Sequence, residues 1–214
     1  SSADATRYAA DMLNTADTIS KEQKASIFFA ALMENISKMK AGQGSNSKIN
    51  EMMNYLYQMY KDVPEVNIKE QLHYLHHTGK QHGLKDCVDQ FPDNCLVILP
   101  DSSTNDIKQM RELLDRGCSI VCMDHHEADR YLEDEDNLVI INNQIQNYPN
   151  KDMSAAGVVW QICRAWDELD NYNYANDFID LAALGILSDM EPYTELENRA
   201  IISLGLQNIK NPFF

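Results

Sequence analysis

Short, continuously apolar runs alternate with amphipathic segments along the middle of the chain. The runs have the length and hydrophobicity of buried strands, and they lie at residues 72–76, 95–99, 119–123 and 138–141. Residues 106–116 carry apolar positions at helical spacing and are followed by Gly117, a residue type that commonly terminates helices. Strands that alternate with helices predict an α/β fold, in which helices flank the core of a parallel β-sheet.

Helical periodicity continues on both sides of this alternating region. Apolar residues recur at helical spacing over residues 4–40, a loop-like stretch follows at 41–47, and a further helix is expected over 49–61. The last third of the chain predicts helices at residues 154–169, 174–187 and 195–206. The expected organisation is therefore a helical N-terminal segment over residues 1–40 and one α/β domain over residues 41–214.

Composition narrows the class of protein. Of the 214 residues, 44% are hydrophobic, which is enough for a packed core. No apolar run reaches the roughly 18 residues that span a bilayer, and no signal-peptide pattern opens the chain, so we expect a cytoplasmic protein without membrane contact. The 5 cysteines lack CxxC zinc spacing, and we expect them to be reduced, mostly buried thiols.

The charge balance bears on nucleic-acid binding. A net charge of −15 weighs against a broad nucleic-acid-binding surface, because neutralising phosphates requires clustered Lys and Arg. Metal ions at an acidic site, or a second domain, can supply the positive charge instead. Charge therefore weakens a nuclease interpretation without excluding it.

Carboxylates and imidazoles stand where two predicted strands and one predicted helix end. These residues are Asp101, Asp124, His125, His126 and Asp189. Because ligands of parallel α/β sheets bind beyond the carboxyl ends of the strands, we expect these side chains to share one rim. Oxygen and imidazole ligands suit Mn²⁺ or Mg²⁺ better than structural zinc, and such ligands around two ions promote phosphoester hydrolysis.

Each of these residues also has a structural alternative. Asp101 could cap the helix that follows it, and Asp189 could be a turn residue before Pro192. His125 and His126 are harder to explain structurally, because two adjacent histidines after an apolar strand point in different directions and so have separate tasks.

Three sequence motifs stand in a characteristic order. They are Leu-Val-Ile-Leu-Pro-Asp101, Val-Cys-Met-Asp124-His125-His126 and Leu-Gly-Ile-Leu-Ser-Asp189. This order resembles the second, third and fourth motifs of the DHH phosphoesterase superfamily. Residues 141–158 and 76–84 are similar to stretches of its RecJ-like single-strand exonucleases from bacteria and phages. The resemblance runs from about residue 72 to the C-terminus.

The resemblance implies a DHH domain and assigns roles to particular residues. The implied catalytic residues are Asp101, Asp124, His125, His126 and Asp189. All of these except Asp124 would be metal ligands, and Asp124 would orient a neighbouring imidazole. The candidates for substrate binding are His77, Lys80, His82, Asn143, Ser154 and Gly157. As alternatives, residues 77–82 could form a polar surface loop, and Ser154 could be a plain helix N-cap.

The activity implied by the resemblance is metal-dependent phosphodiester hydrolysis, in the form of a 5′-to-3′ exonuclease on single-stranded DNA in repair or recombination. The implied cofactor is Mn²⁺ or Mg²⁺, with two ions in a complete site. The implied partner is single-stranded nucleic acid. Short oligonucleotides or cyclic dinucleotides are an alternative substrate class.

Two features of the family have no counterpart in the sequence. A DxDxDG-like motif, whose aspartates hold one metal, should precede residues 49–61, yet residues 40–47 contain no carboxylate. The family's C-terminal substrate-binding domain, with its Gly-rich GGGH-like segment, is also not found. These differences leave open a catalytically inactive DHH domain that acts as a binding or assembly module, with residues 1–40 as the surface for a protein partner.

Overall fold

The computed structural model describes residues 83–171 and 173–210 of the chain. Within these ranges the strands form a three-stranded parallel sheet in the order β1-β2-β3. The strands are β1 (Leu96–Pro100), β2 (Ser119–Asp124) and β3 (Leu138–Asn142). All residues of β3 are buried, as expected of a sheet that is covered on both faces.

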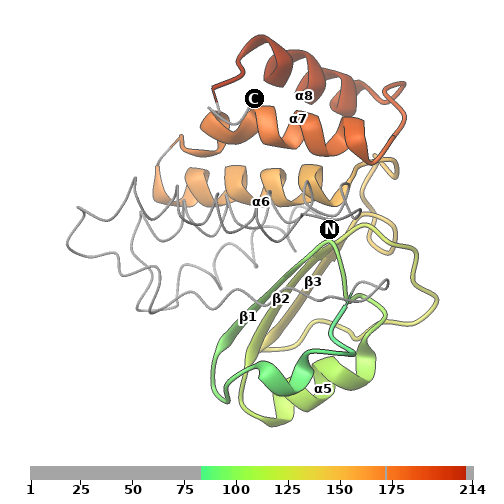
Figure 1. The fold of residues 1–214 in the computed structure, drawn as a ribbon, viewed down its shortest axis with the longest axis vertical. Coiled ribbons are helices and arrows are strands. Elements are labelled where there is room, and N and C mark those ends of the chain that lie inside the picture. The colour runs from blue at the N-terminus through green and yellow to red at the C-terminus, as the bar shows by residue number, and fades with distance from the viewer. Residues whose placement is uncertain (1–82, 172, 211–214) are drawn as a thin grey trace.

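Alternate residues of the strands belong to two separate hydrophobic clusters, one on each face of the sheet. On one face, Ile120 and Cys122 pack with Met110 and Leu113 of α5 (Ile107–Asp115), the helix that connects β1 to β2. On the other face, odd-numbered residues of β2 and β3 pack against α6 (Ala155–Asp170). Figure 1 shows the resulting arrangement, with α5 on one side of the sheet and the C-terminal helices on the other.

The C-terminal helices stack upon one another above α6. A 3₁₀ turn, η2 (Ala175–Phe178), leads into α7 (Ile179–Ser188), and α8 (Leu196–Gln207) packs on α7. Gly185 lets α6 and α7 approach closely, because a Cβ at this position would lie only 2.2 Å from the Cβ of Ala156. This close approach places the end of α7 near the beginning of α6, at the carboxyl end of the sheet (Figure 1).

The predicted fold class is confirmed, since the structure has a parallel sheet flanked by helices. One detail differs: the helix predicted over residues 174–187 begins with the separate turn η2. None of the 5 cysteines forms a disulfide, and no described helix is long and apolar enough to cross a membrane. The elements predicted at residues 4–40, 41–47, 49–61 and 72–76 lie outside the described residues.

Candidate functional site

The chain turns sharply where β1 ends. Asp101 has a left-handed backbone conformation, with φ of 57°, and its backbone N–H donates to the carbonyl oxygen of Met123 at 2.8 Å. Ser103 also has a positive φ, of 82°. Such conformations cost of the order of 1–3 kcal/mol outside glycine and cluster at functional sites. Here they bring the Asp101 carboxylate beside the residues that follow β2.

Three carboxylates surround the imidazole of His125. Its Nε2 lies 3.3 Å from Asp101 Oδ1 and 3.4 Å from Asp189 Oδ2, while its Nδ1 lies 3.4 Å from Glu191 Oε1. Burial alone would lower the pKa of His125, but the contact with Asp101 and the charge of Asp189 outweigh it and raise the pKa to about 9. The ring therefore lies in a strongly anionic environment.

The carboxylate of Asp124 accepts hydrogen bonds from neighbouring residues of the protein. Its Oδ2 accepts hydrogen bonds from the backbone N–H and the hydroxyl of Thr104, at 3.1 and 2.7 Å. Its Oδ1 accepts from the backbone N–H of His125 at 2.8 Å and lies 2.6 Å from Nδ1 of His126. Burial favours a higher pKa for Asp124, yet the hydrogen bonds from His126 and Thr104 hold it well below its ordinary value.

The contact with Asp124 also determines the orientation of the His126 ring. The hydrogen bond between His126 and Asp124 raises the pKa of His126, despite the opposing effect of burial. Since Nδ1 is engaged by Asp124, a contact of His126 with a metal ion or a phosphate would have to use Nε2. The ring centroids of His125 and His126 are 4.8 Å apart and the ring planes are inclined at 66°, so the two side chains point in different directions.

A buried amide ties the ends of the strands together. The Asn142 side chain donates to the Thr104 hydroxyl at 3.0 Å and to the carbonyl oxygen of His126 at 2.9 Å. Sequence reasoning did not select Asn142 or Thr104. Their signal was position, since Asn142 ends β3 and Thr104 lies in the loop that follows β1.

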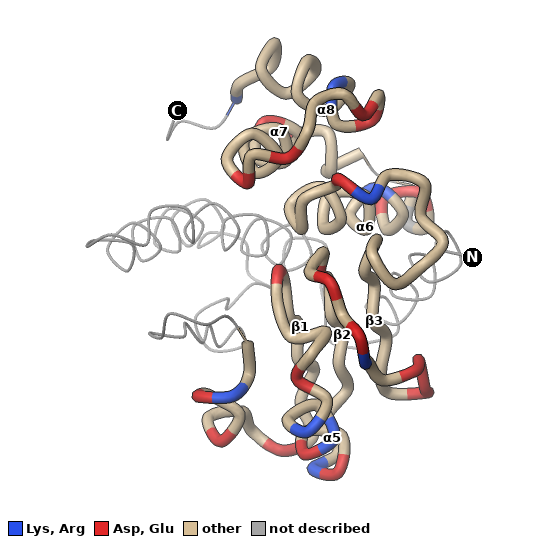
Figure 2. Tube along the Cα trace, turned by 90° about the vertical axis from the view of Figure 1, so that its right-hand side faces the viewer, with Lys and Arg blue, Asp and Glu red and all other residues tan. Residues whose placement is uncertain are grey.

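Two overlapping groups of side chains could hold metal ions. Asp101, His125 and His126 form one group, and His125, Asp189 and Glu191 form the other. In each group, one ligand atom per residue lies within 4.8 Å of the others. Figure 2 shows acidic positions at the upper ends of β1 and β2 and in the connection before α8. The donor set of carboxylate oxygens and imidazoles fits Mn²⁺ or Mg²⁺.

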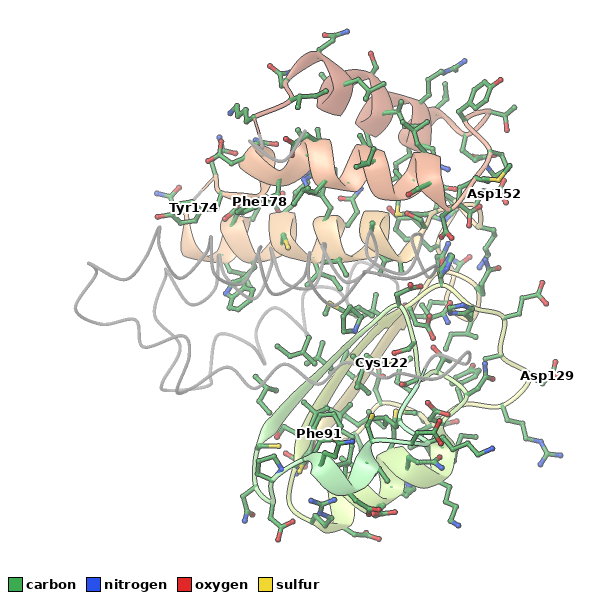
Figure 3. The ribbon with its side chains drawn as sticks, in the orientation of Figure 1. Phe91, Cys122, Asp129, Asp152, Tyr174 and Phe178 are labelled. Carbon is green, nitrogen blue, oxygen red and sulfur yellow. The ribbon has the colours of Figure 1, made fainter. Side chains whose placement is uncertain are left out.

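Glu191 is the member of these groups that sequence reasoning did not select. Its burial and the nearby carboxylates of Asp189 and Asp152 raise its pKa, while His125 opposes the rise. Figure 3 shows Asp152 beside the connection between α7 and α8. The sequence offered one signal, which is that Glu191 stands two residues after Asp189 at the end of the same helix.

The predicted substrate-binding residues that the structure describes make hydrogen bonds within the protein. Asn143 is buried, and its side-chain amide donates to backbone carbonyls in the loop before α6, those of Asn150, Lys151 and Met153. Ser154 is the N-cap of α6 and accepts from the backbone N–H of Gly157 at 3.3 Å, which matches its structural alternative. Substrate contacts by these residues stay predictions. His77, Lys80 and His82 lie outside the described residues.

Comparison with known proteins finds a matching family model and matching relatives. Residues 17–186 match the family model described as "DHH family, N-terminal domain". The chain is 37% identical over 152 residues to "Putative SPbeta prophage-derived single-strand DNA-specific exonuclease YorK" of Bacillus subtilis (strain 168), and equally to its counterpart in Bacillus phage SPbeta. These matches cover 70% of this chain but only 26% of each relative, so the chain spans about a quarter of their length.

One solved structure is also similar, a crystal structure of exonuclease RecJ bound to manganese. The match has 24% sequence identity and a TM-score of 0.48, and it covers 53% of this chain and 29% of that chain.

Proposed function

The chain belongs to the DHH family, and from this premise we propose that its site hydrolyses phosphodiester bonds with divalent metal ions. The observation that supports the proposal most is the convergence of Asp101 and Asp189 on Nε2 of His125, at 3.3 and 3.4 Å. Three elements distant in sequence contribute these groups, so the cluster is a product of the fold.

In this proposal each residue has a defined task. Asp101, His125 and Asp189 hold an ion, and His126 presents Nε2 to a second ion or to the phosphate. A divalent ion there supplies Lewis acidity, which makes water a better nucleophile and neutralises charge on the phosphoester. Asp124 keeps the His126 ring in position through Nδ1 and does not itself bind metal, because its oxygens already accept several hydrogen bonds.

The proposed substrate is single-stranded DNA, degraded from the 5′ end. The names of the Bacillus subtilis and phage relatives support single-stranded DNA, and the resemblance to RecJ-like proteins supports the polarity. The net charge of −15 makes bound Mn²⁺ or Mg²⁺, in one or two sites, important for holding phosphate. A protein partner at residues 1–40 and a cytoplasmic location belong to the same proposal.

A second candidate function is binding without catalysis. The absence of carboxylates from residues 40–47, where the family's first acidic motif should stand, favours a DHH domain that has lost one metal site. Such a domain would bind nucleic acid or protein through the same fold.

End-labelled single-stranded oligonucleotides distinguish the two candidates. We expect the full chain to release mononucleotides from the 5′ end with Mn²⁺ or Mg²⁺, to stop when EDTA is added, and to lose activity in the variant Asp101→Asn. A parallel assay with dinucleotides and cyclic dinucleotides tests the alternative substrate class. If the chain binds Mn²⁺ but hydrolyses none of these substrates, the catalytic proposal is wrong and the binding module remains.

A further inference from the structure

His125 is contacted at both of its ring nitrogens, and the two contacts differ in kind. Nε2 is shared between Asp101 and Asp189, whereas Nδ1 lies 3.4 Å from Glu191. We propose that Glu191 is a positioning residue that accepts a hydrogen bond from Nδ1–H of His125 and so directs the Nε2 lone pair to a divalent ion. This inference rests on the proposed function, since it refines the metal centre.

The two nitrogens of an imidazole ring differ in what they can bind. A neutral ring carries one N–H and one lone pair, and the group that accepts the N–H determines which nitrogen is left to bind metal. The carboxylates on the Nε2 side come from the ends of β1 and α7, and together they provide the ligand partners of an ion. On the Nδ1 side the contact is Glu191. Its carboxylate is close enough to accept a hydrogen bond from Nδ1–H when the ring shifts to bind an ion.

The backbone at the end of α7 brings Glu191 to this position. Met190, between the two carboxylates, has a φ of 58°, and its side chain is 87% exposed, so packing of that side chain does not explain the turn. The N–H of Glu191 donates to the carbonyl oxygen of Ile186 at 3.3 Å, which closes the end of the helix. The turn thus places Asp189 and Glu191 against opposite nitrogens of one ring.

A buried amide holds the segment that follows. The Asn198 side chain, which is fully buried, donates to the carbonyl oxygens of Pro192 at 3.0 Å and of Asp152 at 2.7 Å. Pro192 comes directly after Glu191, so this bracing restricts where the Glu191 carboxylate can lie. Glu191 is itself only 20% exposed. A carboxylate that is restrained and largely buried can hold a metal-binding imidazole ring in one orientation.

Direct metal ligation by Glu191 is the competing role, because it also belongs to a group with His125 and Asp189. One ion cannot use both nitrogens of a ring, since their lone pairs point in different directions. An ion on Nε2 has two carboxylates near it already, whereas Glu191 contacts the other nitrogen. The positioning role therefore agrees with all three contacts.

The variants E191Q and E191A distinguish these roles through the affinity for Mn²⁺, measured by calorimetry on the full chain. A glutamine oxygen can still accept a hydrogen bond from Nδ1–H, so E191Q should bind Mn²⁺ within about threefold of the unaltered protein, whereas E191A should lose about 10–100-fold. Equal large losses in both variants would show that Glu191 is a ligand, and no loss in E191A would show that it has no role. Either result overturns the proposal. E195Q, which removes a nearby acid that makes no cap hydrogen bond, serves as the control.

Nitrogen-15 NMR of the His125 ring provides the readout that a general loss of structure would not produce. In the Mg²⁺-saturated protein and in E191Q, the proton should reside on Nδ1, and finding it on Nε2 would contradict the proposal. Neither measurement depends on hydrolysis. If the unaltered chain binds no Mn²⁺, the proposed function fails, but the nitrogen that carries the proton in the neutral His125 ring of the metal-free protein still tests the role of Glu191.

Discussion

The two ends of the sheet have different surroundings, although the same strands form both. β1 and β2 begin at one end and finish at the other. At the beginning, the thiols of Cys95 and Cys118 lie 3.7 Å apart and each contacts the carbonyl oxygen of Pro92, at 3.2 and 3.4 Å. Nearby, Arg116 pairs with Asp93 at 2.7 Å. Polar groups at this end are paired with one another.

At the finishing end, the described residues include a group of acidic side chains around one histidine. Asp101, Asp189 and Glu191 all contact His125, so three carboxylates share one ring. Even if the ring is protonated, these four groups carry a net charge of two negative units (three minus one). Bringing like charges together is unfavourable unless a cation compensates them. We therefore expect a cation to bind at the carboxyl end of the sheet, where these carboxylates gather, and not at the opposite end of the same strands.

The largest expected effect comes from removing that charge. We expect Asp101→Ala and Asp189→Ala to weaken Mn²⁺ binding by more than the roughly 100-fold that loss of an outer partner can cost. Cys95→Ser, at the opposite end of the same strands, should change the affinity by no more than about twofold. Calorimetric titration measures all three. Equal effects at both ends would remove the distinction between them.

Asp124→Asn should have the next largest effect. The substitution replaces an acceptor of hydrogen bonds from Thr104, His125 and His126, and the free energy of unfolding should fall by about 2–3 kcal/mol near pH 7. Because the folded pKa of Asp124 is depressed, its contribution is present above the ordinary value of 3.8 and is lost as the pH falls below it. Urea unfolding at several pH values measures this, and a variant as stable as the parent at neutral pH would refute it.

The pH should change metal affinity through His125. In the metal-free protein the pKa of His125 is raised to about 9, so its proton competes with an ion at lower pH. Affinity should rise by up to about tenfold per pH unit between pH 7 and 9 and then level off. Conversely, the stability that the protonated ring gives the metal-free protein is complete below its ordinary pKa of 6.5 and is lost as the pH rises through about 9. A flat affinity profile would contradict the proposed ligand role.

The smallest expected effect is that of Thr104→Val. This change removes the hydroxyl that bonds to Asp124 and accepts from Asn142, and it keeps the shape of the side chain. We expect a loss of about 1–2 kcal/mol in the free energy of unfolding and only a small change in Mn²⁺ affinity. Thermal and urea unfolding test the first part, and a loss of metal binding comparable to that of Asp101→Ala would contradict the second.

The strands could be predicted from the sequence because buried parallel strands are short apolar runs bounded by turn residues. The predicted runs at 95–99, 119–123 and 138–141 differ from the observed strands by one residue at each affected end. The strand-end residues Asp101, Asp124 and His125 were visible for the same reason. Their roles in metal binding and catalysis stay predictions.

The parts that could not be predicted depend on backbone conformation and on contacts between distant segments. Glu191 joins the cluster only because Met190 adopts a positive φ, which is unusual for a methionine and leaves no pattern in the sequence. Asn198 braces a loop more than 40 residues away in sequence, through the carbonyl oxygen of Asp152. The side-chain amide of Asn143 donates to the carbonyl oxygen of Met153, and its contact with substrate stays a prediction.

A crystal structure of the chain grown with Mn²⁺ tests the central claim most directly, because anomalous scattering locates the ion without reference to activity. We expect an anomalous peak about 2.0–2.3 Å from His125 Nε2 and from a carboxylate oxygen of both Asp101 and Asp189. A peak on the Nδ1 side of His125, or Mn²⁺ bound only elsewhere on the acidic surface, would contradict it.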